Sequence, residues 1–68
     1  MKLSARNQLV GKVVEIKEGA VNASVKIEIS KDIIISSTIS MDAVKELGLI
    51  VGSDATAVIK ATSVMIMA

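Results

Sequence analysis

The chain has 68 residues, enough for one small domain, and such short chains bury a smaller share of their surface than average domains do. It contains no aromatic residue, no histidine and no cysteine, which excludes disulfides, the usual zinc ligands, thiol or imidazole catalysis and aromatic base stacking. Eight lysines and arginines oppose seven aspartates and glutamates, so the broad positive field that non-specific nucleic-acid binding requires is also missing.

Apolar residues make up 51% of the chain, a high share for a short sequence without aromatic side chains. Small domains compensate for a limited core with disulfides, a structural metal or association with further copies. The missing cysteines and histidines leave association, so the composition predicts a homo-oligomer whose subunits share a core. The longest apolar run is only a few residues and the first residues lack a secretory signal, so we expect a cytoplasmic protein without membrane contact.

Three strands are predicted in the first half of the chain. Residues 10–17 read as a strand, and residues 21–30 alternate apolar and polar side chains without a fault, the pattern of a half-buried strand. Glu18 and Gly19 supply the turn between them, so the two strands predict a hairpin. Residues 33–39 form the third strand, and their β-branched run suits burial on both faces, as at a subunit interface.

A short helix and two further strands are predicted after Ser40. Ser40 is placed to cap a helix of about two turns, and Gly48 is placed to end it. After a turn at residues 51–53, residues 55–61 and 64–67 read as two more strands. Three strands, a helix and two strands match a mostly β fold, a small five-stranded Greek-key barrel of the oligonucleotide-binding-fold type with one short helix.

Hydrogen-bond donors gather directly before the first strand. Ser4, Arg6 and Asn7 bring a hydroxyl, a guanidinium and an amide to this run, which holds no carboxylate. With catalytic and metal-binding side chains largely missing, donors of this kind indicate binding of a small oxyanion. We also expect Asn7 to hydrogen-bond the backbone where the chain enters the strand.

Three segments of the chain resemble the molbindins, the Mop-type domains that bind molybdate. The segments are residues 4–11 (SARNQLVG), 39–49 (ISMDAVKELGL) and 57–64 (AVIKATSV), in family order and with family spacing. The resemblance covers essentially the whole chain, which reads as a single Mop-type domain over residues 1–68. It implies an oligonucleotide-binding-like barrel, a hexamer built as a trimer of dimers, and oxyanion pockets between subunits. The implied function is intracellular binding of molybdate or tungstate for storage or homeostasis, with no cofactor.

The resemblance also implies which residues contact the oxyanion: Ser4, Arg6, Ser40, Lys60 and Ala61. A helix N-terminus at Ser40 would offer free N–H groups to an anion, while arginine supplies a planar fork and lysine a point charge. Where the family often carries a second hydroxyl in the first helical turn, this chain has Ala43, which offers only its backbone N–H. For a second oxyanion site on the threefold axis, the resemblance suggests the backbone of Gly19, Ala20 and Val21.

Each of these residues also has a purely structural interpretation. Ser40 can be only a helix cap, Arg6 an intersubunit ion-pair partner and Lys60 a solvated strand residue. Their joint occurrence with the Ser-Ala-Arg-Asn run favours binding, because the structural interpretation explains the residues only one by one. Met41, Met65 and Met67 are predicted to fill the core or an interface, since thioethers without cysteine or histidine make a poor metal site.

Two other classes of function remain as alternatives. The fold type is compatible with an oligomeric nucleic-acid-binding module, although the chain lacks aromatic platforms and a basic groove. A regulatory interaction module is the other alternative, since related domains occur fused to transcription factors and transporter subunits. An enzyme is not expected, because no pair of carboxylates forms an evident acid–base couple.

Overall fold

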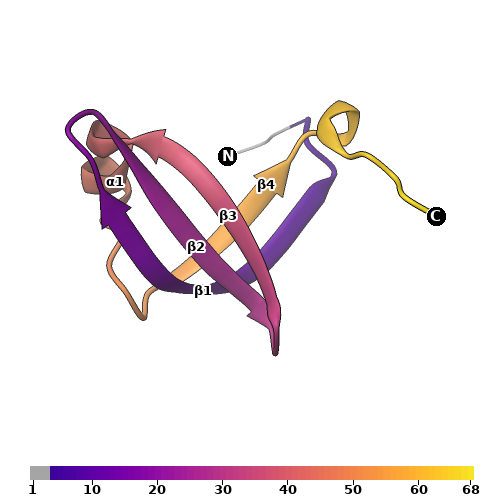
Figure 1. The fold of residues 1–68 in the computed structure, drawn as a ribbon, viewed down its shortest axis with the longest axis horizontal. Coiled ribbons are helices and arrows are strands. Elements are labelled where there is room, and N and C mark those ends of the chain that lie inside the picture. Colours follow the sequence, from indigo (N-terminus) through magenta and orange to yellow (C-terminus); the bar gives the residue numbers. More distant parts are fainter. Residues whose placement is uncertain (1–3) are drawn as a thin grey trace.

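The computed structural model describes residues 4–68, which form one curled antiparallel sheet, a short helix and a 3-10 turn. The elements are β1 (Asn7–Glu18), β2 (Asn22–Ser30), β3 (Ile33–Ser40), α1 (Met41–Leu47), β4 (Asp54–Ile59) and η1 (Ala61–Ser63). The sheet order is β3-β2-β1-β4, so β3 and β4 are its edges. In Figure 1 the strands curl into an open half-barrel, with α1 at one end and η1 at the other. The mostly β character and the single short α-helix are as predicted.

The β1–β2 hairpin is the predicted one, with β1 starting three residues earlier than the alternation indicated. The register shifts between Val13 and Glu15, a bulge that bends the strand. A β-carbon added at Gly11 would lie 2.3 Å from the carbonyl oxygen of Glu28. Glycine therefore permits β1 and β2 to approach closely at the point where the sheet curls.

The core of the half-barrel is small. Among residues 4–68 six apolar residues are buried, and Val13 and Val25 are the most enclosed, each 1% exposed. The full set is Val13, Ala23, Val25, Ile27, Val44 and Ala57. The inward positions of β2 follow the predicted alternation, since Ala23, Val25 and Ile27 share one face. In contrast, Ile33 and Ile34 are 54% and 48% exposed, so the burial on both faces predicted for β3 is not reached within one chain.

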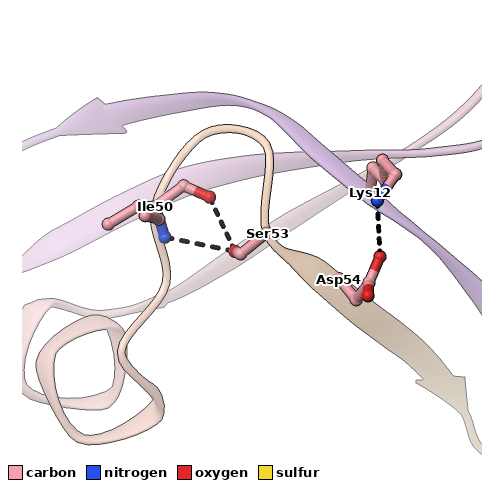
Figure 2. A network of polar contacts seen from close by, with 4 residues as sticks. All are labelled: Lys12, Ile50, Ser53 and Asp54. Carbon is pink, nitrogen blue, oxygen red and sulfur yellow. Dashed lines mark hydrogen bonds and ion pairs between the residues drawn. The ribbon is translucent and has the colours of Figure 1, made fainter.

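The helix begins and ends where the sequence predicts. The Ser40 Oγ accepts a hydrogen bond of 3.0 Å from the Ala43 N–H, and Gly48 ends the helix in the left-handed conformation with φ 64°. Val44 is the buried residue that fixes α1 to the sheet. The tight turn that leads from α1 to β4 is shown in Figure 2, where the Ser53 hydroxyl bonds the backbone of Ile50.

An exposed ion pair joins β1 to β4 beside this turn. The Lys12 Nζ lies 2.7 Å from the Asp54 Oδ1, and the two residues are also cross-strand partners (Figure 2). This contact holds the pKa of the Asp54 carboxyl below its ordinary value of 3.8, through the hydrogen bond first and the charge of Lys12 second. Both side chains are mostly solvent-exposed, so the pair contributes little to stability.

Residues 4–68 form four strands, where the sequence predicts five. The fourth strand ends at Ile59, so Lys60 and Ala61, which were predicted to end the strand, instead begin the 3-10 turn. Residues 64–67 have no strand pairing in the described structure. The physical reason is that η1 turns the chain out of the β4 direction, so this apolar segment meets neither edge of its own sheet.

Candidate anion-binding site

The first group of predicted site residues lies where β1 begins and β4 ends. The two strands are antiparallel, and Asn7 pairs with Ile59, so Arg6 and Lys60 occupy adjacent chain flanks at this end of the sheet. The Asn7 side-chain amide donates a 3.2 Å hydrogen bond to the Ile59 carbonyl oxygen, which is the backbone contact predicted for it. Ser4 and Ala61 belong to the same end by their positions in the chain.

This first group is positively charged and open to solvent. Ser4, Arg6, Lys60 and Ala61 are all exposed. Within residues 4–68 the ion pairs are Lys12–Asp54 and Lys26–Glu15, so neither cation of the group has a carboxylate partner there. Two cations near each other without a neighbouring carboxylate favour an anion at this end.

The second group lies at the opposite end, where the β1–β2 turn meets the start of α1. Ser40 is the cross-strand partner of Asn22. The Met41 N–H donates a 2.8 Å hydrogen bond to the Val21 carbonyl oxygen, which fixes the turn to the helix start. Gly19 closes the turn through a 2.9 Å bond to the Asn22 carbonyl oxygen. The structure therefore brings the predicted second-site residues, Gly19, Ala20 and Val21, next to Ser40.

The hydrogen bonds at the helix start limit which donors remain for a ligand. The Ala43 N–H, predicted to face the anion, donates instead to the Ser40 Oγ. The Met41 N–H is bonded to Val21, so among the described residues Asp42 carries the first-turn N–H without a partner. The sequence does not single out Asp42, because only its backbone N–H is concerned and every residue except proline carries one. The Ser40 Oγ accepts this bond and donates none among the described residues, so its hydroxyl proton is available to a ligand.

The two groups are too far apart to serve one small anion within one chain. The curved strand β1 of 12 residues lies between them, and its eleven steps of about 3.3 Å give a contour length of roughly 36 Å. Figure 1 shows the consequence directly, with α1 and η1 at opposite ends of the sheet. Arg6 and Lys60 thus lie at one end of the sheet, and Ser40 lies beside the turn at Val21 at the other end. The two groups are separate within one chain.

An apolar cavity in the described part of the chain is a different feature from these groups. It has a volume of about 550 Å³ and lies between the edge strands, lined mainly by apolar side chains such as Val25, Ile35, Ile39 and Ala57. None of the predicted oxyanion ligands lines it. Residues 4–68 also contain no cluster of three acidic residues that could hold a metal ion, and no helix there is long and apolar enough to cross a membrane.

Comparison with known proteins identifies close relatives over nearly the whole chain. The TOBE domain model matches residues 3–66. A probable molybdenum-pterin-binding protein of Haemophilus influenzae is 62% identical over 97% of this chain and 96% of its own length. The solved structure of a molybdate-binding protein from Sporomusa ovata superposes with a TM-score of 0.93, at 35% identity over the full length of both chains.

A third similarity is to a longer protein. The cytoplasmic molybdate-binding protein ModG, solved with molybdate bound, matches with a TM-score of 0.85 and 49% identity. The match covers 90% of this chain and 43% of the ModG chain. All three relatives are described as binding proteins, and the two solved structures are described as binding molybdate.

Proposed function

The chain belongs to the TOBE domain family, and from that premise we propose that it binds molybdate or tungstate reversibly. The support is the identity to a molybdenum-pterin-binding protein and the structural match to two molybdate-binding proteins. The composition agrees, since the chain offers hydrogen-bond donors and cations but no histidine or cysteine. The alternatives of a nucleic-acid-binding or regulatory module gain no support from these relatives.

The proposed site is supported by the positions of its residues in one chain. Arg6 and Lys60 lie at one end of the sheet and Ser40 lies at the other. A single pocket that contains all three therefore requires two copies. The protein then acts as a homo-oligomer, a hexamer arranged as a trimer of dimers, with the oxyanion between subunits. This assembly also covers the exposed isoleucines of β3.

The chemistry of this pocket is binding without reaction. The Arg6 guanidinium presents a fork of donors, Lys60 a mobile positive charge and Ser40 a hydroxyl proton, while the backbone of Ala61 completes the contact. These charge-assisted bonds replace the water shell of the dianion when the subunits close around it. The backbone of Gly19, Ala20 and Val21 contributes a second oxyanion site, where copies meet around a threefold axis. The cellular role is storage and homeostasis of the oxyanion in the cytoplasm.

This function is tested by calorimetric titration with molybdate, with sulfate and phosphate as controls. Light scattering of the same protein gives the mass of the oligomer. We expect saturable molybdate binding to an oligomer and a loss of affinity in the Arg6→Ala variant. The matched control is Lys31→Ala, which removes a cation from the exposed β2–β3 turn. A protein that releases no heat with molybdate contradicts the function, whereas unchanged affinity in Arg6→Ala contradicts only the assigned site.

A further inference from the structure

Asn7, the first residue of β1, attaches the start of that strand to the end of β4. It is the cross-strand partner of Ile59, and its side-chain Nδ2 donates a 3.2 Å hydrogen bond to the Ile59 carbonyl oxygen. Asparagine is depleted in strands, because its short amide competes with the backbone for hydrogen bonds. Here that amide links two strands, between residues that lie 52 positions apart in the chain.

The end of β4 has little other support. β4 is an edge strand, so within residues 4–68 β1 is its only neighbour in the sheet. The Asn7–Ile59 pair is the last pair of the β1–β4 ladder, and the Lys12–Asp54 ion pair lies at the other end of that ladder. Terminal pairs of a ladder open more readily than internal ones. A half-buried side-chain bond at the last pair therefore holds this end closed.

The two cations of the site, Arg6 and Lys60, lie directly outside this last pair. The Lys60 carbonyl oxygen accepts a 2.8 Å hydrogen bond from the Ser63 N–H in η1. The Ala5 carbonyl oxygen, next to Arg6, accepts a 3.3 Å bond from the Gln8 Nε2. Both bonds are local, so each orders the backbone beside one cation without relating the two cations to each other. The interstrand bond of the last pair is the contact that relates them.

We propose that Asn7 is a positioning residue of the oxyanion site, because its bond to β4 sets the spacing between Arg6 and Lys60. The two cations repel each other until an anion lies between them, and this repulsion favours an open end of the ladder. A bond that holds the spacing removes part of the ordering cost from the binding step, so the oxyanion binds more tightly. Asn7 acts through the two cations and needs no contact with the anion. The inference rests on the proposed function, because it concerns the residues that bind the oxyanion there.

The spacing is tested first without molybdate, through the thiol–disulfide equilibrium of two substituted pairs, since the natural chain has no cysteine. Arg6→Cys with Lys60→Cys places a thiol on each flank of the last pair, and Val10→Cys with Thr56→Cys places two thiols on internal partners of the same ladder. Equilibration with glutathione gives the effective concentration of each intramolecular thiol pair, which depends on how often the two α-carbons lie within about 4.4–6.8 Å. Each pair is measured in the chain that retains Asn7 and in Asn7→Leu, which has nearly the same size but no donor.

We expect Asn7→Leu to lower the effective concentration of the flanking pair about 2- to 12-fold, the equivalent of one hydrogen bond, and to leave the internal pair unchanged. An equal fall in both pairs indicates only a general loss of stability and overturns the proposal, as does an unchanged flanking pair. A flanking pair that forms no disulfide even with Asn7 present also overturns it, because the two flanks are then not adjacent. Asn7→Ala, which also lacks the donor, is measured in parallel and decides the question if Asn7→Leu does not fold.

Calorimetric titration of the cysteine-free protein then tests whether this spacing matters for the ligand. We expect molybdate affinity to fall by a similar factor, about 2- to 12-fold, in Asn7→Leu and Asn7→Ala. The matched control is Thr56→Val, an exposed substitution in the same ladder, which should bind molybdate like the wild type. Unchanged affinity in a folded Asn7 variant whose flanking pair has loosened overturns the positioning role. If the wild type does not bind molybdate although the flanking pair responds to Asn7, only the proposed function is refuted.

Discussion

Replacing Ser40 with aspartate separates the two roles that we assign to this side chain, helix cap and anion ligand. In the wild-type chain the Ser40 Oγ accepts the Ala43 N–H bond of 3.0 Å, and its proton is free for an oxyanion. An aspartate carboxylate accepts the same N–H bond and suits the positive end of the helix dipole. It has no proton to donate and carries a charge that repels a dianion. The substitution therefore preserves the cap and removes the ligand.

The sizes of the two effects follow from these contacts. Aspartate is expected to leave the free energy of unfolding unchanged or raise it by about 0.3–1 kcal/mol through the helix dipole. Loss of one hydrogen bond to a charged group costs about 1.5–3 kcal/mol, which is about 10- to 150-fold in Kd, and charge repulsion adds to this loss. Ser40→Ala loses the same ligand bond without repulsion, but it also loses the cap, at about 1 kcal/mol of stability.

Two measurements on the same variants check this prediction. Urea unfolding without molybdate ranks stability, and we expect aspartate at or above serine, with alanine lowest. Calorimetric titration ranks molybdate affinity, and we expect serine highest, alanine lower and aspartate lowest. Ser30→Asp is the matched control, because it adds the same charge at an exposed position at the far end of β2. If Ser40→Asp binds molybdate as tightly as the wild type, Ser40 is not a ligand and acts only as a cap.

Three further predictions concern stability, each measured by urea unfolding at one protomer concentration. Gly11→Ala is expected to cost about 1–3 kcal/mol, because the new β-carbon would lie 2.3 Å from the Glu28 carbonyl oxygen; an unchanged midpoint contradicts this contact. Val13→Ala removes two buried carbons and should cost about 2–3 kcal/mol, whereas the same change at Val10, 70% exposed, should cost less than about 0.5 kcal/mol. Asp54→Asn should lower stability slightly at neutral pH. Lys12 lowers the pKa of Asp54 in the folded state, so the ion pair stabilises the fold at pH values above the ordinary pKa of 3.8 and loses this effect as pH falls through the lowered pKa. The difference in stability between Asp54→Asn and the wild type should therefore vanish towards pH 3, and a difference that grows instead refutes the pairing.

Local patterns in the sequence predict most of the fold. The alternation in residues 21–30 gives β2 and its buried face, because a strand with one face on a core must place every second residue there. Ser40 and Gly48 give the helix, because they satisfy the backbone groups that a helix leaves free at its ends. The start of β1 at Asn7 was less predictable, since its first residues pair with β4, which lies more than forty residues along the chain.

The candidate site is harder to predict, because the types of its residues do not tell how far apart these residues lie in the folded chain. Arg6 and Lys60 come together through the β1–β4 register, and no local pattern around either residue encodes that pairing. The hydrogen bond from the Ala43 N–H to the Ser40 Oγ depends on the geometry of the helix cap. The sequence predicts that a cap exists at Ser40 but does not predict that geometry. The identities of the site residues rest on the family resemblance, whereas their division between two ends is visible only in the structure.

For the predicted fifth strand, residues 64–67, the sequence pattern and the structure of one chain differ. The uninterrupted apolar residues 64–67 predict a strand, because such a segment is stable when it is paired and covered. In one chain the η1 turn, fixed by the Val64 N–H and the Ala61 carbonyl oxygen, carries the segment away from the open edges of β3 and β4. The excess of apolar residues over the small core of one chain agrees with the association of copies that the composition predicts, because apolar surface left outside that core is covered only by a further surface.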